Sequence, residues 1–110
     1  MEKKNKNKRT VIKLTSNKDR EKLEIAVMKI LALDGFKPFN YKGESCYKKG
    51  DGFTSYPEYI KTEYTSNEII ITAWVYFWGK ERELDKKFIA CVPKQDCLTT
   101  VNKLIALVNA

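Results

Sequence analysis

The sequence predicts an α+β domain in which one antiparallel β-sheet carries two helices on one face. The first observation is the stretch Asn67–Trp78, which is rich in β-branched and aromatic residues and too short to span a membrane. The second is a helical spacing of apolar residues, which occurs once near each end of the chain. The predicted order is strand, helix, four strands, helix. A single sheet with both helices on one face is the simplest way to bury all these apolar surfaces.

The N-terminal residues differ in charge from the rest of the chain. Residues 1–9 hold five of the 21 Lys and Arg residues, and we expect them to form a flexible basic tail. Residues 10–110 are then one domain, which is long enough to bury a hydrophobic core. No apolar segment follows the basic residues and no apolar run reaches membrane length, so we expect a cytoplasmic protein without a membrane contact.

The first predicted elements are a strand and a helix. Thr10 to Leu14 is a short strand candidate. Ser16 is placed to cap a helix, with Asp19 at the position of a capping-box acid, and Gly35 is placed to end it. The predicted helix runs from about Asn17 to Asp34. Its apolar stripe consists of Leu23, Ala26, Val27, Ile30 and Leu31.

Two hairpins are predicted next. Residues 36–41 and 44–49 flank Lys42-Gly43, a dipeptide suited to a tight turn because Gly accepts a positive φ. A Gly-containing loop then leads to a strand over residues 56–65. The turn Ser66-Asn67 joins this strand to the long one.

The second hairpin has a predicted register, since pairing Thr65 with Glu68 aligns the residues of both strands by face. The largely apolar face pairs Tyr64 with Ile69, Thr62 with Ile71 and Ile60 with Ala73. The reverse face pairs Lys61 with Thr72, Tyr59 with Trp74 and Pro57 with Tyr76.

The last part of the chain is predicted to be a connection and a helix. Residues 79–87 form a charged, exposed connection, and Phe88–Val92 is either an edge strand or a buried linker. Pro93 suits the first turn of the second helix. The apolar face of that helix consists of Leu98, Val101, Leu104, Ile105 and Val108.

The chain shows two resemblances. The order of its elements is similar to the half-domain of the TATA-box-binding-protein fold and to cystatin-type sheets, which implies a topology and no function. The residues Lys48-Lys49-Gly50-Asp51-Gly52, Tyr56 to Lys61 and Ala73-Trp74 resemble a small uncharacterised bacterial family over roughly residues 41–78. Some members of that family carry a zinc ribbon. This chain has no paired Cys motif, so metal binding does not carry over.

The composition gives little support for catalysis, a metal site or a cofactor. The chain has no His, which removes the commonest general base and metal ligand, and we expect no enzymatic activity. Its three cysteines are Cys46, Cys91 and Cys97, and their spacing is not that of a zinc site. We interpret them as reduced thiols.

The candidate site is an aromatic stripe on the sheet face opposite the helices. It consists of Tyr59, Lys61, Trp74, Tyr76 and Trp78. An exposed stripe of this kind is typical of a protein contact, and we expect a homodimer or a partner protein to cover it. The alternative is single-stranded nucleic acid, with rings stacking on bases and with Lys48 and Lys49 as anion contacts. A third possibility is that residues 79–92 fold over the stripe within the monomer.

Overall fold

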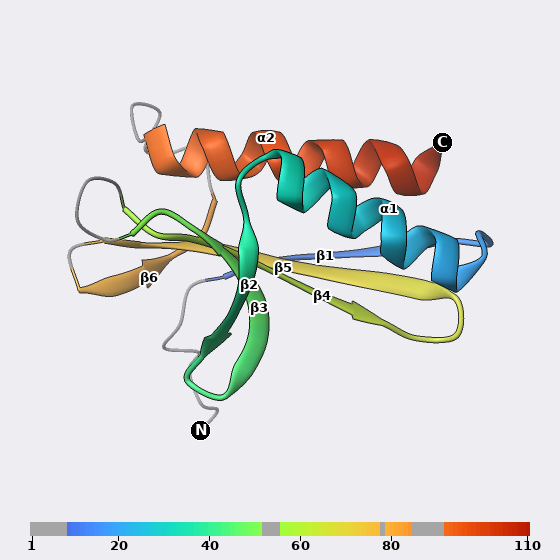
Figure 1. The fold of residues 1–110 in the computed structure, drawn as a ribbon, viewed down its shortest axis with the longest axis horizontal. Coiled ribbons are helices and arrows are strands. Elements are labelled where there is room, and N and C mark those ends of the chain that lie inside the picture. The colour runs from blue at the N-terminus through green and yellow to red at the C-terminus, as the bar shows by residue number, and fades with distance from the viewer. Residues whose placement is uncertain (1–8, 52–55, 78, 85–91) are drawn as a thin grey trace, which may run out of the picture.

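The computed structural model of the chain describes residues 9–51, 56–77, 79–84 and 92–110, with only the backbone of residues 77, 92 and 93. Figure 1 shows two helices lying on one face of a single twisted sheet. The elements are β1 (Thr10–Thr15), α1 (Arg20–Leu33), β2 (Lys37–Tyr41), β3 (Glu44–Lys49), β4 (Glu58–Tyr64), β5 (Glu68–Phe77), β6 (Lys80–Arg82) and α2 (Val92–Asn109). The predicted α+β class is confirmed, and the element order differs from the predicted one by an additional strand, β6, between β5 and α2.

The sheet has the strand order β1-β5-β4-β3-β2, with every pair antiparallel. The short strand β6 was not predicted and lies within the segment we interpreted as an exposed connection. It forms because β5 is longer than β1. The residues of β5 beyond Ala73 have no partner in β1, and β6 pairs with Val75 to Phe77 instead. Gly79, at a φ of +73°, lies in the turn between β5 and β6.

The register predicted for the second hairpin is confirmed. Tyr64 lies opposite Ile69, and Tyr59 lies opposite Trp74. The backbone N–H of Tyr76 donates to the carbonyl of Pro57 at 3.0 Å, which continues the same register beyond the described end of β4.

The first helix ends as predicted but begins later. Asp19 is its N-cap and accepts a hydrogen bond from the Lys22 backbone N–H at 3.2 Å. The predicted cap, Ser16, instead accepts from the Lys18 N–H outside the helix. At the other end Gly35 has a φ of +93°, and the Phe36 N–H donates to the Leu31 carbonyl at 2.8 Å. This closure is a Schellman motif, which needs a residue that tolerates positive φ.

The first hairpin turns through Lys42 and Gly43, whose φ values are +51° and +90°. Positive φ at both positions defines a type I′ turn, whose twist matches that of the flanking strands. The hairpin β2–β3 bends away from the helices and extends below the rest of the sheet (Figure 1). This bend brings Tyr41, at the end of β2, onto the face of the sheet opposite the helices.

The main core lies between the sheet and the helices. It contains the fully buried odd-numbered residues of β5, which are Ile69, Ile71, Ala73 and Val75. The helices contribute Leu23, Val27, Leu31, Cys97, Val101, Leu104 and Val108. Phe88–Val92, which we predicted as an edge strand or a linker, lies outside the described residues except for the backbone of Val92, the first residue of α2. No helix in the described part of the chain is long and apolar enough to cross a bilayer.

Candidate interaction sites

The described rings of the aromatic stripe belong to a second, smaller core. Trp74 is fully buried and Tyr59 is 5% exposed, and the two rings stack with centroids 5.2 Å apart and an interplanar angle of 14°. Tyr41, at the end of the bent hairpin, packs against both rings at centroid distances of 4.6 and 5.4 Å. Tyr59 and Trp74 do lie on the face opposite the helices, but the expectation that they are exposed contact residues is wrong.

Arg9 covers the cluster from outside. Its guanidinium carbon lies 3.7 Å from the centroid of the Trp74 ring. The guanidinium also donates to Glu81 at 2.8 and 2.9 Å and to Glu44 at 3.0 and 3.1 Å. We assigned Arg9 to a flexible tail, and this assignment is wrong because the side chain is 15% exposed and docked. A planar guanidinium suits this position because it stacks on a ring and binds two carboxylates together.

The charges of this cover are coupled. Hydrogen bonds from Arg9 lower the pKa of Glu44 to about 2, against the opposing effect of burial. Burial alone would lower the pKa of Arg9, but its hydrogen bonds to Glu81 and Glu44 raise it above the ordinary value. The Tyr41 hydroxyl donates to Glu81 at 2.8 Å, and burial together with this bond raises the pKa of Tyr41. The cluster therefore stays charged and fixed at neutral pH.

The other predicted contact residues are also mostly engaged. Lys61 donates to Glu44 at 3.0 Å, so its charge is balanced within the chain. Tyr76 is half-buried against the aromatic cluster. Trp78 lies outside the described residues. The stripe thus offers little open aromatic surface in the part of the chain that the structure describes.

Lys49 lies on the helix side and is not an open anion contact. It donates to Asp96 in the first turns of α2 at 2.7 Å. Asp96 also shares a hydrogen bond with Glu58, which is 6% exposed. Burial, reinforced by that bond, raises the pKa of Glu58 to about 8. The two carboxyls therefore share a proton, held on Glu58.

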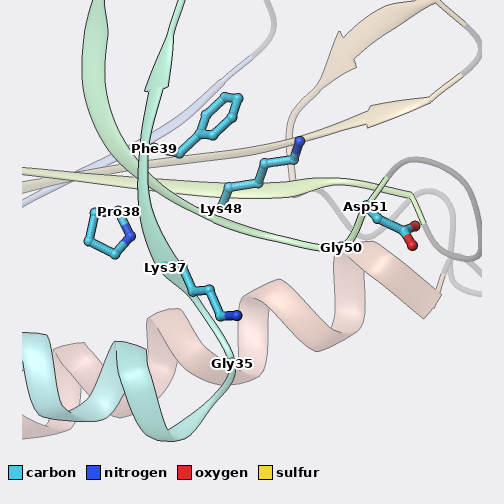
Figure 2. A pocket seen from close by; sticks show the side chains of 7 residues that line it. All are labelled: Gly35, Lys37, Pro38, Phe39, Lys48, Gly50 and Asp51. Carbon is cyan, nitrogen blue, oxygen red and sulfur yellow. The ribbon is translucent and has the colours of Figure 1, made fainter.

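Lys48 is the one predicted anion contact that lines an open pocket. The pocket has a volume of about 510 Å³ and is lined by Gly35, Lys37, Pro38, Phe39, Lys48, Gly50 and Asp51 (Figure 2). Lys37 and Lys48 are opposite each other in the hairpin register, so their side chains leave the same face. Phe39 is 38% exposed, and the Lys48 ammonium lies 4.4 Å from the centroid of its ring.

Among the described residues, the outer edge of β1 is a second open surface beyond Thr10, whose hydroxyl accepts a hydrogen bond from the Leu84 N–H at 2.8 Å. The Ser16 N–H donates to the Asn67 carbonyl, so even-numbered residues of β1 direct their backbone groups toward β5. The odd-numbered residues Val11, Lys13 and Thr15 therefore direct theirs outward. All three are exposed, and Val11 is 55% exposed.

Sequence reasoning missed Lys37, Phe39, Tyr41 and the charged cover. The turn at Lys42-Gly43 does carry a signal for the first three, because a two-residue turn sets the hairpin register and places them on the face of Lys48. No signal in the sequence identifies the docking of Arg9, which depends on distant residues of β3 and β6.

Comparison of the chain with protein-family models, with curated proteins and with solved structures gives no match. The two resemblances noted from the sequence therefore stay predictions. Among the described residues, no three His, Cys, Asp or Glu side chains are close enough to hold a metal ion. The described cysteines, Cys46 and Cys97, are buried free thiols, and burial raises the pKa of both.

Proposed function

We propose that the chain is a non-enzymatic interaction domain that forms a homodimer by pairing β1 with β1 of a second copy. The observation that carries this proposal is the outer edge of β1, where Val11, Lys13 and Thr15 direct backbone groups outward. An edge of this kind is a template for another strand unless the protein blocks it. Self-association therefore remains the proposed function, but the proposed dimer interface is this edge and not the buried aromatic cluster.

The opposite edge of the sheet is interrupted by a proline, and the contrast supports the proposal. In a hairpin with a two-residue turn, Tyr41 and Glu44 exchange both hydrogen bonds, so the backbone groups of Pro38 and Asn40 in β2 are directed outward. Pro38 has no N–H, which interrupts any ladder along that edge. The described part of β1 contains no proline, and its Lys13 is the one charge among residues 10–15.

The sequence of β1 also fits a copy of itself. With Ile12 opposite its symmetry mate, Val11 of each copy faces Lys13 of the other, and these outward-directed residues form hydrogen-bonded pairs. A register centred on Lys13 would instead oppose two ammonium groups, which is destabilising. The Ile12 register therefore makes the hydrogen bonds without that repulsion.

A row of half-buried apolar side chains lies beside this edge and would become more buried in the dimer. Ile12 and Leu14 are half-buried on the helix side of β1. On α2, which contacts β1, Thr100 and Lys103 face the end of α1 through Asp34. At 100° per residue, the half-buried Leu98 and Ile105 leave α2 on the opposite side, toward the β1 edge. The half-buried apolar side chains along this edge are therefore Ile12, Leu14, Leu98 and Ile105.

Cytoplasmic location is part of the proposal, supported by the free thiols of Cys46 and Cys97, which persist in reducing compartments. Binding of single-stranded nucleic acid by the aromatic stripe has lost its main support because Tyr59 and Trp74 are buried.

The test is sedimentation equilibrium of the full chain and two proline variants. Lys13→Pro removes an outward N–H from β1, and we expect it to be monomeric at concentrations where the unchanged chain is a dimer. Asn40→Pro removes an outward N–H from β2 and is the matched control, which we expect to dimerise normally. Far-UV circular dichroism confirms that both variants fold.

A charge pair at Val11 makes the test sharper. Val11→Lys places an ammonium opposite Lys13 of the other copy and weakens the dimer, whereas Val11→Glu forms a cross-strand ion pair and strengthens it. A monomeric wild-type chain at all concentrations, or the same response to both charges, would contradict the proposal.

A further inference from the structure

We infer that the pocket beside the β2–β3 hairpin binds a phosphate monoester carried on a hydroxylated ligand, such as a sugar phosphate or a nucleotide. The pocket is at the opposite edge of the sheet from β1, so this inference goes beyond the proposed dimer and does not depend on it.

The positive charge of the pocket comes from two lysines. Lys37 and Lys48 are direct cross-strand neighbours on one face, and like charges in that arrangement repel each other. Figure 2 shows the two side chains diverging, with the Lys48 ammonium on the side of Phe39. A phosphate monoester carries a charge of about −1.5 to −2 at neutral pH, so one such group between the lysines converts repulsion into two charge-assisted hydrogen bonds.

The walls and the volume of the pocket limit the size of the ligand. Phe39 gives an exposed ring beside Lys48, and Gly50, at a φ of +96°, forms another side without a side chain. The volume of about 510 Å³ is within the usual range of small-molecule pockets. A second hollow on the hairpin, of about 530 Å³, is lined by uncharged residues, so the cations distinguish the first.

The lining of the pocket also contains an acidic residue, Asp51. Asp51 is exposed and already takes part in an interaction within the chain. A carboxylate has about four acceptor positions, so it can accept a further hydrogen bond from a ligand hydroxyl. Its negative charge disfavours a second phosphate nearby. The combination of two lysines and one carboxylate therefore selects a ligand with one phosphate and adjacent hydroxyl groups over a polyanion.

The test is a titration of the 15N-labelled full chain with ribose 5-phosphate, followed by amide chemical shifts. We expect saturable shifts at Lys37, Phe39, Lys48, Gly50 and Asp51. Ribose without phosphate should not bind, and inorganic phosphate should bind more weakly than the sugar phosphate. Adenosine monophosphate and a single-stranded oligonucleotide distinguish a free nucleotide from a chain as the source of the phosphate.

Matched lysine variants locate the site. Lys37→Gln and Lys48→Gln should each weaken ribose 5-phosphate about tenfold, because each removes one hydrogen bond from a charged donor. Lys42→Gln, an exposed turn lysine of the same hairpin that does not line the pocket, should have no effect. Equal losses in all three variants would overturn the inference. Equal affinity for inorganic phosphate, or binding of the oligonucleotide alone with shifts on other faces, would overturn it too.

Discussion

The two faces of the sheet are both covered, but by different chemistry. On one face α1 and α2 bury aliphatic side chains of β5 such as Ile71. On the other face the sheet covers itself, since the bent β2–β3 hairpin places Tyr41 over the stacked rings of Tyr59 and Trp74. Arg9 completes that cover with two carboxylates.

This difference shows why an aromatic stripe on a strand does not by itself indicate a binding surface. Aliphatic residues on the helix side need another layer of secondary structure. The large rings of the second face are closed by one tyrosine, one arginine and the twist of a hairpin. Charged and hydroxyl groups of that cover bond to one another, as in the bond from Tyr41 to Glu81, whereas the buried Trp74 Nε1 beneath them has no hydrogen-bond partner among the described residues. Such a face looks like an interface in the sequence and is a small core in the structure.

The largest expected effect is the loss of a ring from the second face. We predict that Trp74→Ala lowers the free energy of unfolding by about 4 kcal/mol, as large as the loss from Ile71→Ala on the helix face. Urea unfolding followed by far-UV circular dichroism measures both. If Trp74 were an open contact residue, its replacement would cost within about 0.5 kcal/mol, and the two faces would not be comparable cores.

Removal of the charged cover has the next largest expected effect. Arg9→Met leaves the buried Glu81 without its cation, and we predict a loss of about 2 kcal/mol. Arg9→Lys should lose less, because it keeps the charge but not the planar stacking or the two-carboxylate geometry. Adding Glu81→Gln to Arg9→Met should restore part of the stability. A double variant no more stable than Arg9→Met would contradict this assignment.

The two faces should also respond to pH in opposite directions. The pKa of Glu44 is about 2 against an ordinary 4.5, so its contribution to stability is present above pH 4.5 and lost as the pH falls toward 2. The pKa of Glu58 is about 8, so its folded form retains a proton that the unfolded chain has released, and stability falls as the pH rises from 4.5 to 8. Urea unfolding across this range should show that Glu58→Gln removes the upper decline and Glu44→Gln reduces the lower one. A Glu58→Gln curve parallel to wild type from pH 5 to 8 would refute the shared proton.

The smallest expected effect is at the hairpin turn that positions Tyr41. Lys42 is a non-glycine residue with a φ of +51°, a conformation that Asn adopts more readily. We predict that Lys42→Asn stabilises the fold by about 0.5 kcal/mol and that Gly43→Ala destabilises it by about 1 kcal/mol. Thermal unfolding of the two variants checks the signs, and a stabilising Gly43→Ala would mean that the turn differs from type I′.

The parts of the fold that could be predicted follow from local patterns. The alternation along β5 and the turn at Ser66-Asn67 determine the β4–β5 register, and the positive-φ turn at Lys42-Gly43 determines the first hairpin. The site could not be predicted because it depends on the bend of that hairpin, a property of the whole sheet. Arg9 belongs to a basic run in the sequence, and only Glu44 and Glu81, 35 and 72 residues away, explain its position.

Tryptophan emission gives the most direct test of the claim that the second face is closed within one chain. Trp78→Phe leaves Trp74 as the sole tryptophan, and the emission is measured with a neutral quencher on dilute protein shown to be monomeric. The account predicts blue-shifted emission that the quencher barely reduces, and a red shift with easier quenching when Arg9→Met is added. Red-shifted, readily quenched emission from the monomer with Arg9 intact would show an open aromatic face and contradict the account.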